Sequence, residues 1–236
     1  MKGDDQLNSI LKTLVSLAAA GTMMVSAPLD EAAPQHDIDG TLFLINRQWR
    51  VSKNYIPELM RQAEVSGKVR TMQVEAAAAL EEMYAACKEE ENITLTTISG
   101  YRSYATQRAI YNRKLDSVGS KAKADEYVAR AGASEHQLGM AMDVSQKGRS
   151  NLSTSFARYG GGKWLMENCW RFGFIIRYQK GWEDVTGYEY EPWHVRYVGK
   201  EAAAAIHDNE MPLEHYLLLL RQERLIDIII GEKVME

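Results

Sequence analysis

The pattern of apolar and polar residues predicts a chain in which helices and short strands are mixed. Within residues 73–90, four apolar side chains recur at the i, i+3, i+4 and i+7 spacing of one helix face: Leu80, Met83, Tyr84 and Cys87. Residues 93–99, ITLTTIS, alternate and are rich in β-branched side chains, which favours a strand. Gly100 ends this strand, and Ser103 is placed to cap a following helix.

The same pattern of apolar and polar residues predicts the elements in the rest of the chain. Further strands are expected at residues 41–46, 139–144, 174–178 and 194–199. Further helices are expected at residues 103–115, 122–130, 163–172, 200–208 and 212–224, with a loop at the glycines 160–162 and a stop at Gly173. The elements form no regular βαβ repeat. We therefore predict an α+β fold, with a small mixed or antiparallel sheet flanked by helices.

The chain has 236 residues, which suits one domain with an extension at each end. We expect an N-terminal segment and linker at residues 1–40, the folded domain at 41–224 and a tail at 225–236. Residues 10–27 are nearly uncharged and end in a Val-Ser-Ala that resembles a signal-peptidase site. The two acids in the preceding MKGDDQ do not suit a secretory n-region, and Pro28 would hinder cleavage. Two alternatives stay open. The segment either exports the protein or tethers it to a membrane, which places it outside the cytoplasm, or it is an amphipathic or poorly ordered N-terminal segment of a cytoplasmic protein.

Charge and cysteine content give no support for nucleic-acid binding or for a cysteine zinc site. The formal net charge is −4, so no broad basic field indicates nucleic acid. The two cysteines, Cys87 and Cys169, form no CxxC pattern, so a cysteine zinc site is unsupported. Both lie in apolar helical contexts and are expected to be buried free thiols, with a disulfide between them as the open alternative.

The stretch SEHQLGMAMD, residues 134–143, carries the first candidate chemistry. In the predicted strand, Met140, Met142 and Val144 share the parity that suits the core, so Asp143 points the other way, toward a cleft or solvent. His136 precedes the strand, and Gly139 permits a turn between them. A loop histidine and a strand aspartate can therefore converge.

A third partner is expected in EPWH, residues 191–194. Pro192 disfavours a helical Glu191, so this segment is extended or a turn. Two histidines and a carboxylate with an open fourth position form a catalytic zinc ligand set, and Glu191 suits a general base that does not bind metal. Spacing alone leaves the alternative of surface residues or caps for each of these side chains. Three other histidines show no usable carboxylate spacing: His36, His207 and His215.

The quoted motifs also resemble a known family. SEHQLGMAMD matches the Ser-x-His-x-x-Gly-x-Ala-x-Asp pattern of the VanY-like D-alanyl-D-alanine carboxypeptidases. EPWHVRYVG is similar to their second motif, and SGYRS at residues 99–103 looks like their first. The resemblance runs from about Leu42 to about Tyr216. Relatives often have proline or histidine where this chain has Gly132 and Ala133, and the C-terminal LIDIIIGEKVME is longer and more apolar than expected.

The resemblance implies a site, a cofactor and a substrate. It implies one Zn²⁺ on His136, Asp143 and His194, with Glu191 as general base and acid. Arg102 would stabilise the developing oxyanion or the substrate carbonyl. Four further positions would line the substrate pocket: Gln107, Ser134, Tyr178 and Trp193.

The implied activity is a D,D-carboxypeptidase that removes the terminal D-alanine from peptidoglycan stem peptides. Two alternatives keep the chemistry and change the substrate, namely an L,D-carboxypeptidase and a D,D-dipeptidase. A third alternative is a non-catalytic cell-wall-binding module on the same fold.

Overall fold

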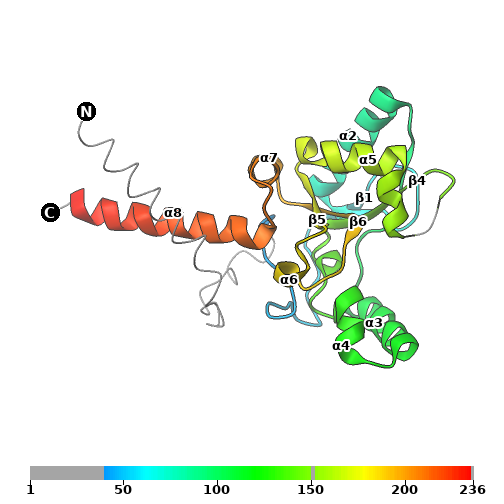
Figure 1. The fold of residues 1–236 in the computed structure, drawn as a ribbon, viewed down its shortest axis with the longest axis horizontal. Helices are drawn as coiled ribbons and strands as arrows, with labels where there is room; N and C mark the ends of the chain where they lie inside the picture. Colours follow the sequence, from blue (N-terminus) through cyan, green and yellow to red (C-terminus); the bar gives the residue numbers. More distant parts are fainter. Residues whose placement is uncertain (1–39, 150–151, 235–236) are drawn as a thin grey trace. The chain divides into compact units, whose positions relative to one another are not determined.

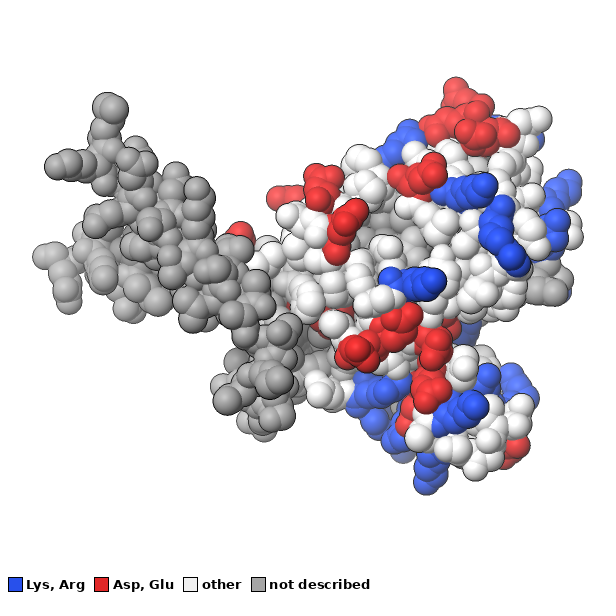
Figure 2. Space-filling view, viewed as in Figure 1, with Lys and Arg blue, Asp and Glu red and all other residues white. Residues whose placement is uncertain are grey.

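A computed structural model describes residues 40–149 and 152–234. The apolar segment expected at residues 10–27 and nearly all of the expected linker lie outside these residues, so their predicted roles stay predictions. Within the described part of the chain, no helix combines the length and apolarity that crossing a membrane requires. Figure 2 shows acidic and basic side chains interspersed on the displayed face, in keeping with the small net charge.

A four-stranded antiparallel sheet holds the strands in the order β3-β4-β6-β5. Its members are β3 (Leu95–Ser99), β4 (Ala141–Gln146), β5 (Phe174–Tyr178) and β6 (Glu191–Tyr197). A separate antiparallel pair joins β1 (Met60–Gln62) to β2 (Thr71–Gln73). Because β4 and β6 are central and adjacent, side chains that face the same way on these two strands come together.

The α-helices are α2 (Val74–Glu91), α3 (Tyr104–Val118), α4 (Lys121–Tyr127), α5 (Gly160–Asn168), α6 (Glu183–Thr186), α7 (Lys200–Asp208) and α8 (Leu213–Val234). Figure 1 shows α2, α5 and α7 beside the sheet, while α3 and α4 form a pair that projects from it and α8 extends away from it. Three 3-10 turns are η1 (Glu135–Leu138), η2 (Thr154–Arg158) and η3 (Cys169–Phe172). The predicted α+β class is confirmed, since the chain combines helices with a small antiparallel sheet.

The hydrophobic core lies between the sheet and the pair α2 and α5. Helix α2 buries the four apolar positions expected from its periodicity: Leu80, Met83, Tyr84 and Cys87. Met142 and Val144 of β4 are fully buried, as their parity predicted. A second cluster packs α7 and the start of α8 against β5 around Ile175, Ile206 and Leu213. Cys87 and Cys169 are buried and unpaired, as expected.

Residues 41–46 are not the strand that their apolar run predicted. The run is buried, as its apolar composition suggests, at Phe43, Leu44 and Ile45. The prediction of a strand conformation was wrong. The carbonyls of Thr41 and Phe43 accept hydrogen bonds from the Arg196 guanidinium, at 2.9 and 3.0 Å. A buried arginine therefore replaces the neighbouring strand that these carbonyls would otherwise need.

The three glycines at residues 160–162 begin helix α5 and do not form the expected loop. A Cβ on Gly162 would lie 2.0 Å from the Phe156 carbonyl oxygen, so glycine serves close packing at this helix start. At the other end of the chain, α8 continues to Val234 and does not stop near residue 224. The boundary expected between a domain at 41–224 and a tail at 225–236 thus falls inside a helix.

Candidate metal and catalytic site

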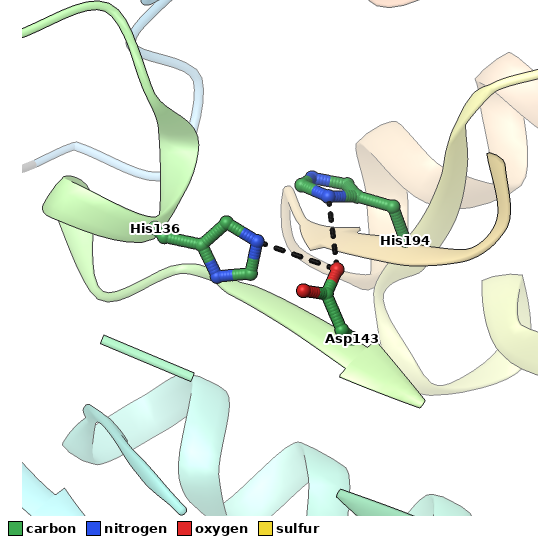
Figure 3. A group of neighbouring side chains, drawn as sticks. All are labelled: His136, Asp143 and His194. Atoms are coloured by element: carbon green, nitrogen blue, oxygen red, sulfur yellow. Dashed lines mark ion pairs between the residues drawn. The ribbon is translucent and has the colours of Figure 1, made fainter. Parts of the chain in front are cut away.

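Two imidazoles and one carboxylate converge on the face of the sheet opposite α2 and α5. Figure 3 shows His136, Asp143 and His194 pointing toward one another from η1, β4 and β6. The Oδ1 atom of Asp143 lies 3.3 Å from His136 Nε2 and 3.3 Å from His194 Nδ1. All three side chains are buried, and their ligand atoms lie within 4.8 Å of one another. The sequence-predicted ligands therefore come together.

Strand register and one turn place these groups. Asp143 and His194 are direct partners in the β4–β6 ladder, so they project to the same side at adjacent positions. His136 lies in the short 3-10 turn η1, where the sequence predicted a loop. Gly139 closes η1 with φ 70°, a conformation that favours glycine, and β4 begins two residues later.

The donor geometry fits a tetrahedral dication. Bonds of about 2.0–2.1 Å to nitrogen and oxygen would set tetrahedral ligand atoms roughly 3.3 Å apart. Both measured separations from Asp143 Oδ1 equal 3.3 Å. Two histidines and one carboxylate with a fourth position open match catalytic zinc sites. His136, Asp143 and His194 are thus the residues that would hold the ion.

The ring nitrogens that face away from the ligand cluster are also engaged. His136 Nδ1 lies 2.8 Å from the Gly100 carbonyl oxygen, which can only accept a hydrogen bond. His194 Nε2 lies 3.1 Å from Glu135 Oε2. A proton on each of these nitrogens leaves His136 Nε2 and His194 Nδ1 as the donor atoms for a metal. Such outer partners fix the tautomer and orientation of metal-binding histidines.

Glu191 reaches the same site because strand β6 bulges. Residues three apart in a regular strand face opposite sides of the sheet. Between the pairs Ile176–Val195 and Tyr178–Glu191, β5 advances two residues while β6 advances four. This bulge re-aims the side chains of β6. As a result, Glu191 Oε2 lies 3.7 Å from His194 Nδ1, on the same side as the ligands.

The buried charges shift one another's proton affinity. Burial raises the pKa of Glu191 to about 8, with the negative Asp143 adding to the shift and the positive His194 opposing it. Burial also dominates at His136, where it lowers the pKa to about 4 with help from the Arg102 charge. Burial lowers the pKa of His194, but hydrogen bonds to Asp143 and Glu135 outweigh it and raise the value to about 9.

Arg102 lies in the site, held from three sides. Its Nη2 donates to Asp143 Oδ2, its Nε donates to Ser99 Oγ at 2.7 Å, and its Nη1 contacts Gln107 Oε1 at 3.4 Å. One extra residue in β3, between Thr97 and Ser99, sets Ser99 opposite Asp143. The guanidinium is therefore fixed beside the ligand cluster while its side chain keeps 16% of its surface exposed.

The four expected pocket residues lie at different places around the site. The Tyr178 ring packs against His194, with 4.9 Å between the ring centroids. Ser134 is buried just before η1, and its side chain does not cap that turn. Trp193 is partly buried on β6. Gln107 is buried, and its amide nitrogen donates to the Ala129 carbonyl at 2.8 Å. This bond orients the amide oxygen of Gln107 toward Arg102 Nη1. Their substrate contacts stay predictions.

Sequence reasoning missed Glu135 as part of the site. Its buried carboxylate contacts His194 and two buried arginines, Arg177 and Arg196. The sequence held one signal for this cluster. Both arginines interrupt apolar strands, FIIRY and HVRYV, and a fully buried arginine is rarely found without a partner.

The fold and this ligand set define the class as a protein with a catalytic-type metal site built on an antiparallel sheet. Comparison with known proteins then gives the family. The VanY family profile, described as D-alanyl-D-alanine carboxypeptidase, matches residues 69–200. The chain belongs to this family of D-alanyl-D-alanine carboxypeptidases.

Individual relatives agree with this placement. A putative carboxypeptidase of Bacillus subtilis, YodJ, is 43% identical over 185 residues, which is 75% of this chain and 67% of that protein. The solved LdcB LD-carboxypeptidase is 42% identical, with a TM-score of 0.72, over 76% of this chain and 86% of LdcB. A vancomycin-resistance D,D-pentapeptidase VanY, solved with Zn(II), is 33% identical with a TM-score of 0.64. That match covers 75% of this chain and 98% of the pentapeptidase.

Proposed function

We propose that the protein is a zinc-dependent D,D-carboxypeptidase that removes the terminal D-alanine from peptidoglycan stem peptides. The observation that carries the proposal is the convergence of His136 Nε2, Asp143 Oδ1 and His194 Nδ1 with a further carboxylate beside them. Membership of the VanY family and the likeness to a Zn(II)-bound pentapeptidase support the metal and the substrate class. We propose one zinc ion per chain, because one such ligand set is present among the described residues.

Hydrolysis needs an activated water, a polarised carbonyl and a proton for the leaving amine. Zinc bound at the three ligands would act as a Lewis acid and lower the pKa of a coordinated water to about 7. Glu191, in its ionised form, takes the proton of the attacking water as the new C–O bond forms. It returns that proton to the amine of D-alanine as the C–N bond breaks. A carboxylate near the ligands that is not itself a ligand suits this role.

Arg102 supplies positive charge where the carbonyl oxygen becomes negative. Its guanidinium donates in a fixed fork and stays charged at any working pH. The contacts with Ser99 and Gln107 hold the fork in place, so little reorganisation is needed when substrate binds. Ser134, Tyr178 and Trp193 are proposed to line the pocket for the peptide end.

An L,D-carboxypeptidase is the second candidate. The LdcB LD-carboxypeptidase is more similar to this chain, at 42% identity and a TM-score of 0.72, than the VanY pentapeptidase, at 33% and 0.64. The two activities use the same metal chemistry and differ in the residue that precedes the scissile bond. Only the substrate can separate them.

A substrate panel tests both candidates. Zinc-loaded protein is incubated with muropeptides of three, four and five residues and with free D-Ala-D-Ala, and products are identified by mass. Conversion of pentapeptide to tetrapeptide supports the D,D activity. Conversion of tetrapeptide to tripeptide supports the L,D activity, and cleavage of the free dipeptide alone indicates a dipeptidase. Zinc-loaded protein that cleaves none of them contradicts the proposal and favours a binding module.

Stem peptides of assembled peptidoglycan lie outside the cytoplasm, and residues 10–27 are apolar enough to act as an export or tethering signal. We therefore propose an extracytoplasmic protein, secreted or tethered through this segment. Fusion of residues 1–40 to a reporter that is active only after export tests this. A reporter that stays inactive in the cytoplasm would contradict it.

A further inference from the structure

A buried carboxylate, Glu135, stands behind the metal ligand His194. Its Oε2 lies 3.1 Å from His194 Nε2, and its Oε1 accepts from Arg177 Nε at 2.7 Å and from Arg196 Nη1 at 3.1 Å. The side chain has no exposed surface. A buried carboxylate with both oxygens engaged is fixed in position, so the atom that it offers to His194 is fixed as well.

The two arginines connect Glu135 to segments far away in sequence. The Arg177 guanidinium donates two hydrogen bonds to the Glu214 carboxylate at the start of α8, from Nη1 to Oε2 at 3.0 Å and from Nη2 to Oε1 at 2.6 Å. Arg196 donates to the carbonyls of Thr41 and Phe43. Two guanidiniums thus face two carboxylates. Glu214, whose side chain is 14% exposed, is the outermost member of this network.

The network acts on one ligand and not on the other. The outer nitrogen of His136 faces a backbone carbonyl, that of Gly100, which no side-chain change removes. The outer nitrogen of His194 faces the Glu135 carboxylate, which accepts hydrogen bonds and cannot donate them. The proton of a neutral His194 therefore belongs on Nε2, and the lone pair belongs on Nδ1, toward Asp143. His194 is the ligand whose orientation depends on a replaceable residue.

We propose that Glu135 is a positioning residue for catalysis, which fixes the Nε2–H tautomer and ring orientation of His194. We include Glu214, which supports Glu135 through Arg177. Glu135 touches neither substrate nor metal in this arrangement and acts only through His194. The inference rests on the proposed function, because it requires a metal at His194 Nδ1. It goes further by making the start of α8 part of the support for the metal site.

The first test reads the tautomer directly in the unaltered protein. Protein labelled with 15N-histidine and loaded with zinc is examined by two-bond 15N–1H correlation spectroscopy. We expect His194 to carry its proton on Nε2 and to coordinate through Nδ1. Coordination through Nε2 would overturn the inference while leaving the zinc peptidase intact. Protein that binds no zinc would overturn the proposed function and this inference with it.

The second test measures zinc affinity by competition with a chelator. Glu135→Gln keeps the size and one acceptor but loses the charge. We expect it to weaken zinc binding by about 10- to 100-fold, the usual loss when the outer partner of a metal-binding histidine is changed. A folded Glu135→Gln protein with unchanged zinc affinity would refute the inference.

A third variant tests the outer end of the network even if Glu135→Gln does not fold. Glu214→Gln removes charge from the outer end of the network. Glu81→Gln is the matched control, because Glu81 also holds an arginine fork, from Arg61, away from the ligands. The two variants are compared when they lower the melting temperature by the same amount. Under that condition, we expect Glu214→Gln to weaken zinc binding more than Glu81→Gln does. Equal affinities for the two variants would remove α8 from the proposal.

Discussion

Replacing Glu191 by glutamine separates proton transfer from metal binding. The carboxylate lies 3.7 Å from His194 Nδ1 and is not part of the set whose ligand atoms lie within 4.8 Å of one another. Its side chain is 18% exposed, so water and substrate can reach it. Glutamine has nearly the same shape and preserves the strand position opposite Tyr178, but its amide does not accept a proton.

The expected loss follows from the role of the group. A positioned acid or base contributes about 10²- to 10⁴-fold in rate, which corresponds to about 2.7–5.4 kcal/mol of barrier at 1.36 kcal/mol per decade. Zinc affinity should stay close to that of the unaltered protein, because the three ligand atoms are unchanged. The loss should therefore fall on kcat, with metal content kept.

The assay pairs zinc content with release of D-alanine from a pentapeptide. Glu189→Gln is the control, since it makes the same change on an exposed residue two positions earlier. Zinc lost from Glu191→Gln to the same extent as from His194→Ala would show that Glu191 is a ligand, and the assigned role would be wrong. Full turnover with glutamine at this position would refute the role of base.

Three further variants probe the rest of the site. His194→Ala should abolish tight zinc binding, and zinc should then no longer raise the melting temperature; an unchanged zinc response would contradict its role as ligand. Arg102→Lys should lower activity by at least about tenfold, because one oxyanion donor is worth roughly 2.7–4 kcal/mol; unchanged kcat and KM would exclude that role. Ser103→Ala removes the cap that accepts from the Thr106 amide, so denaturant unfolding should show a loss of about 0.5–2 kcal/mol with zinc binding kept. An unchanged free energy of unfolding would show that this cap contributes nothing.

The ligand set could be predicted because it depends on local sequence and simple strand geometry. His136 and Asp143 lie within one short motif, and the alternation of β4 correctly separates Asp143 from the core positions Met142 and Val144. The side of the sheet to which Asp143 points could be predicted, but the burial of Asp143 could not. Asp143 is almost fully buried, and the side chains that contact it, His136, His194 and Arg102, come from other elements of the chain.

What could not be predicted depends on partners that are distant in the chain. The run at residues 41–46 has the composition of a strand, yet its carbonyls pair with Arg196, more than a hundred residues away. The glycines at 160–162 have the composition of a loop, yet they begin a helix, and Gly162 is needed there because Phe156 leaves no room for a Cβ. The strand pair β1–β2 has three residues on each side, too few for periodicity to show.

The pairing of Asp143 with His194 also has a consequence for how such enzymes diversify. Ser99, Asp143 and His194 form one row across β3, β4 and β6, so their spacing is set by backbone hydrogen bonds between strands. The length of chain that connects these strands does not enter that spacing. Insertions or deletions in the connections can therefore reshape the walls around the substrate while the reactive centre keeps its dimensions. Evolution can alter which peptide is cut without having to rebuild the chemistry that cuts it.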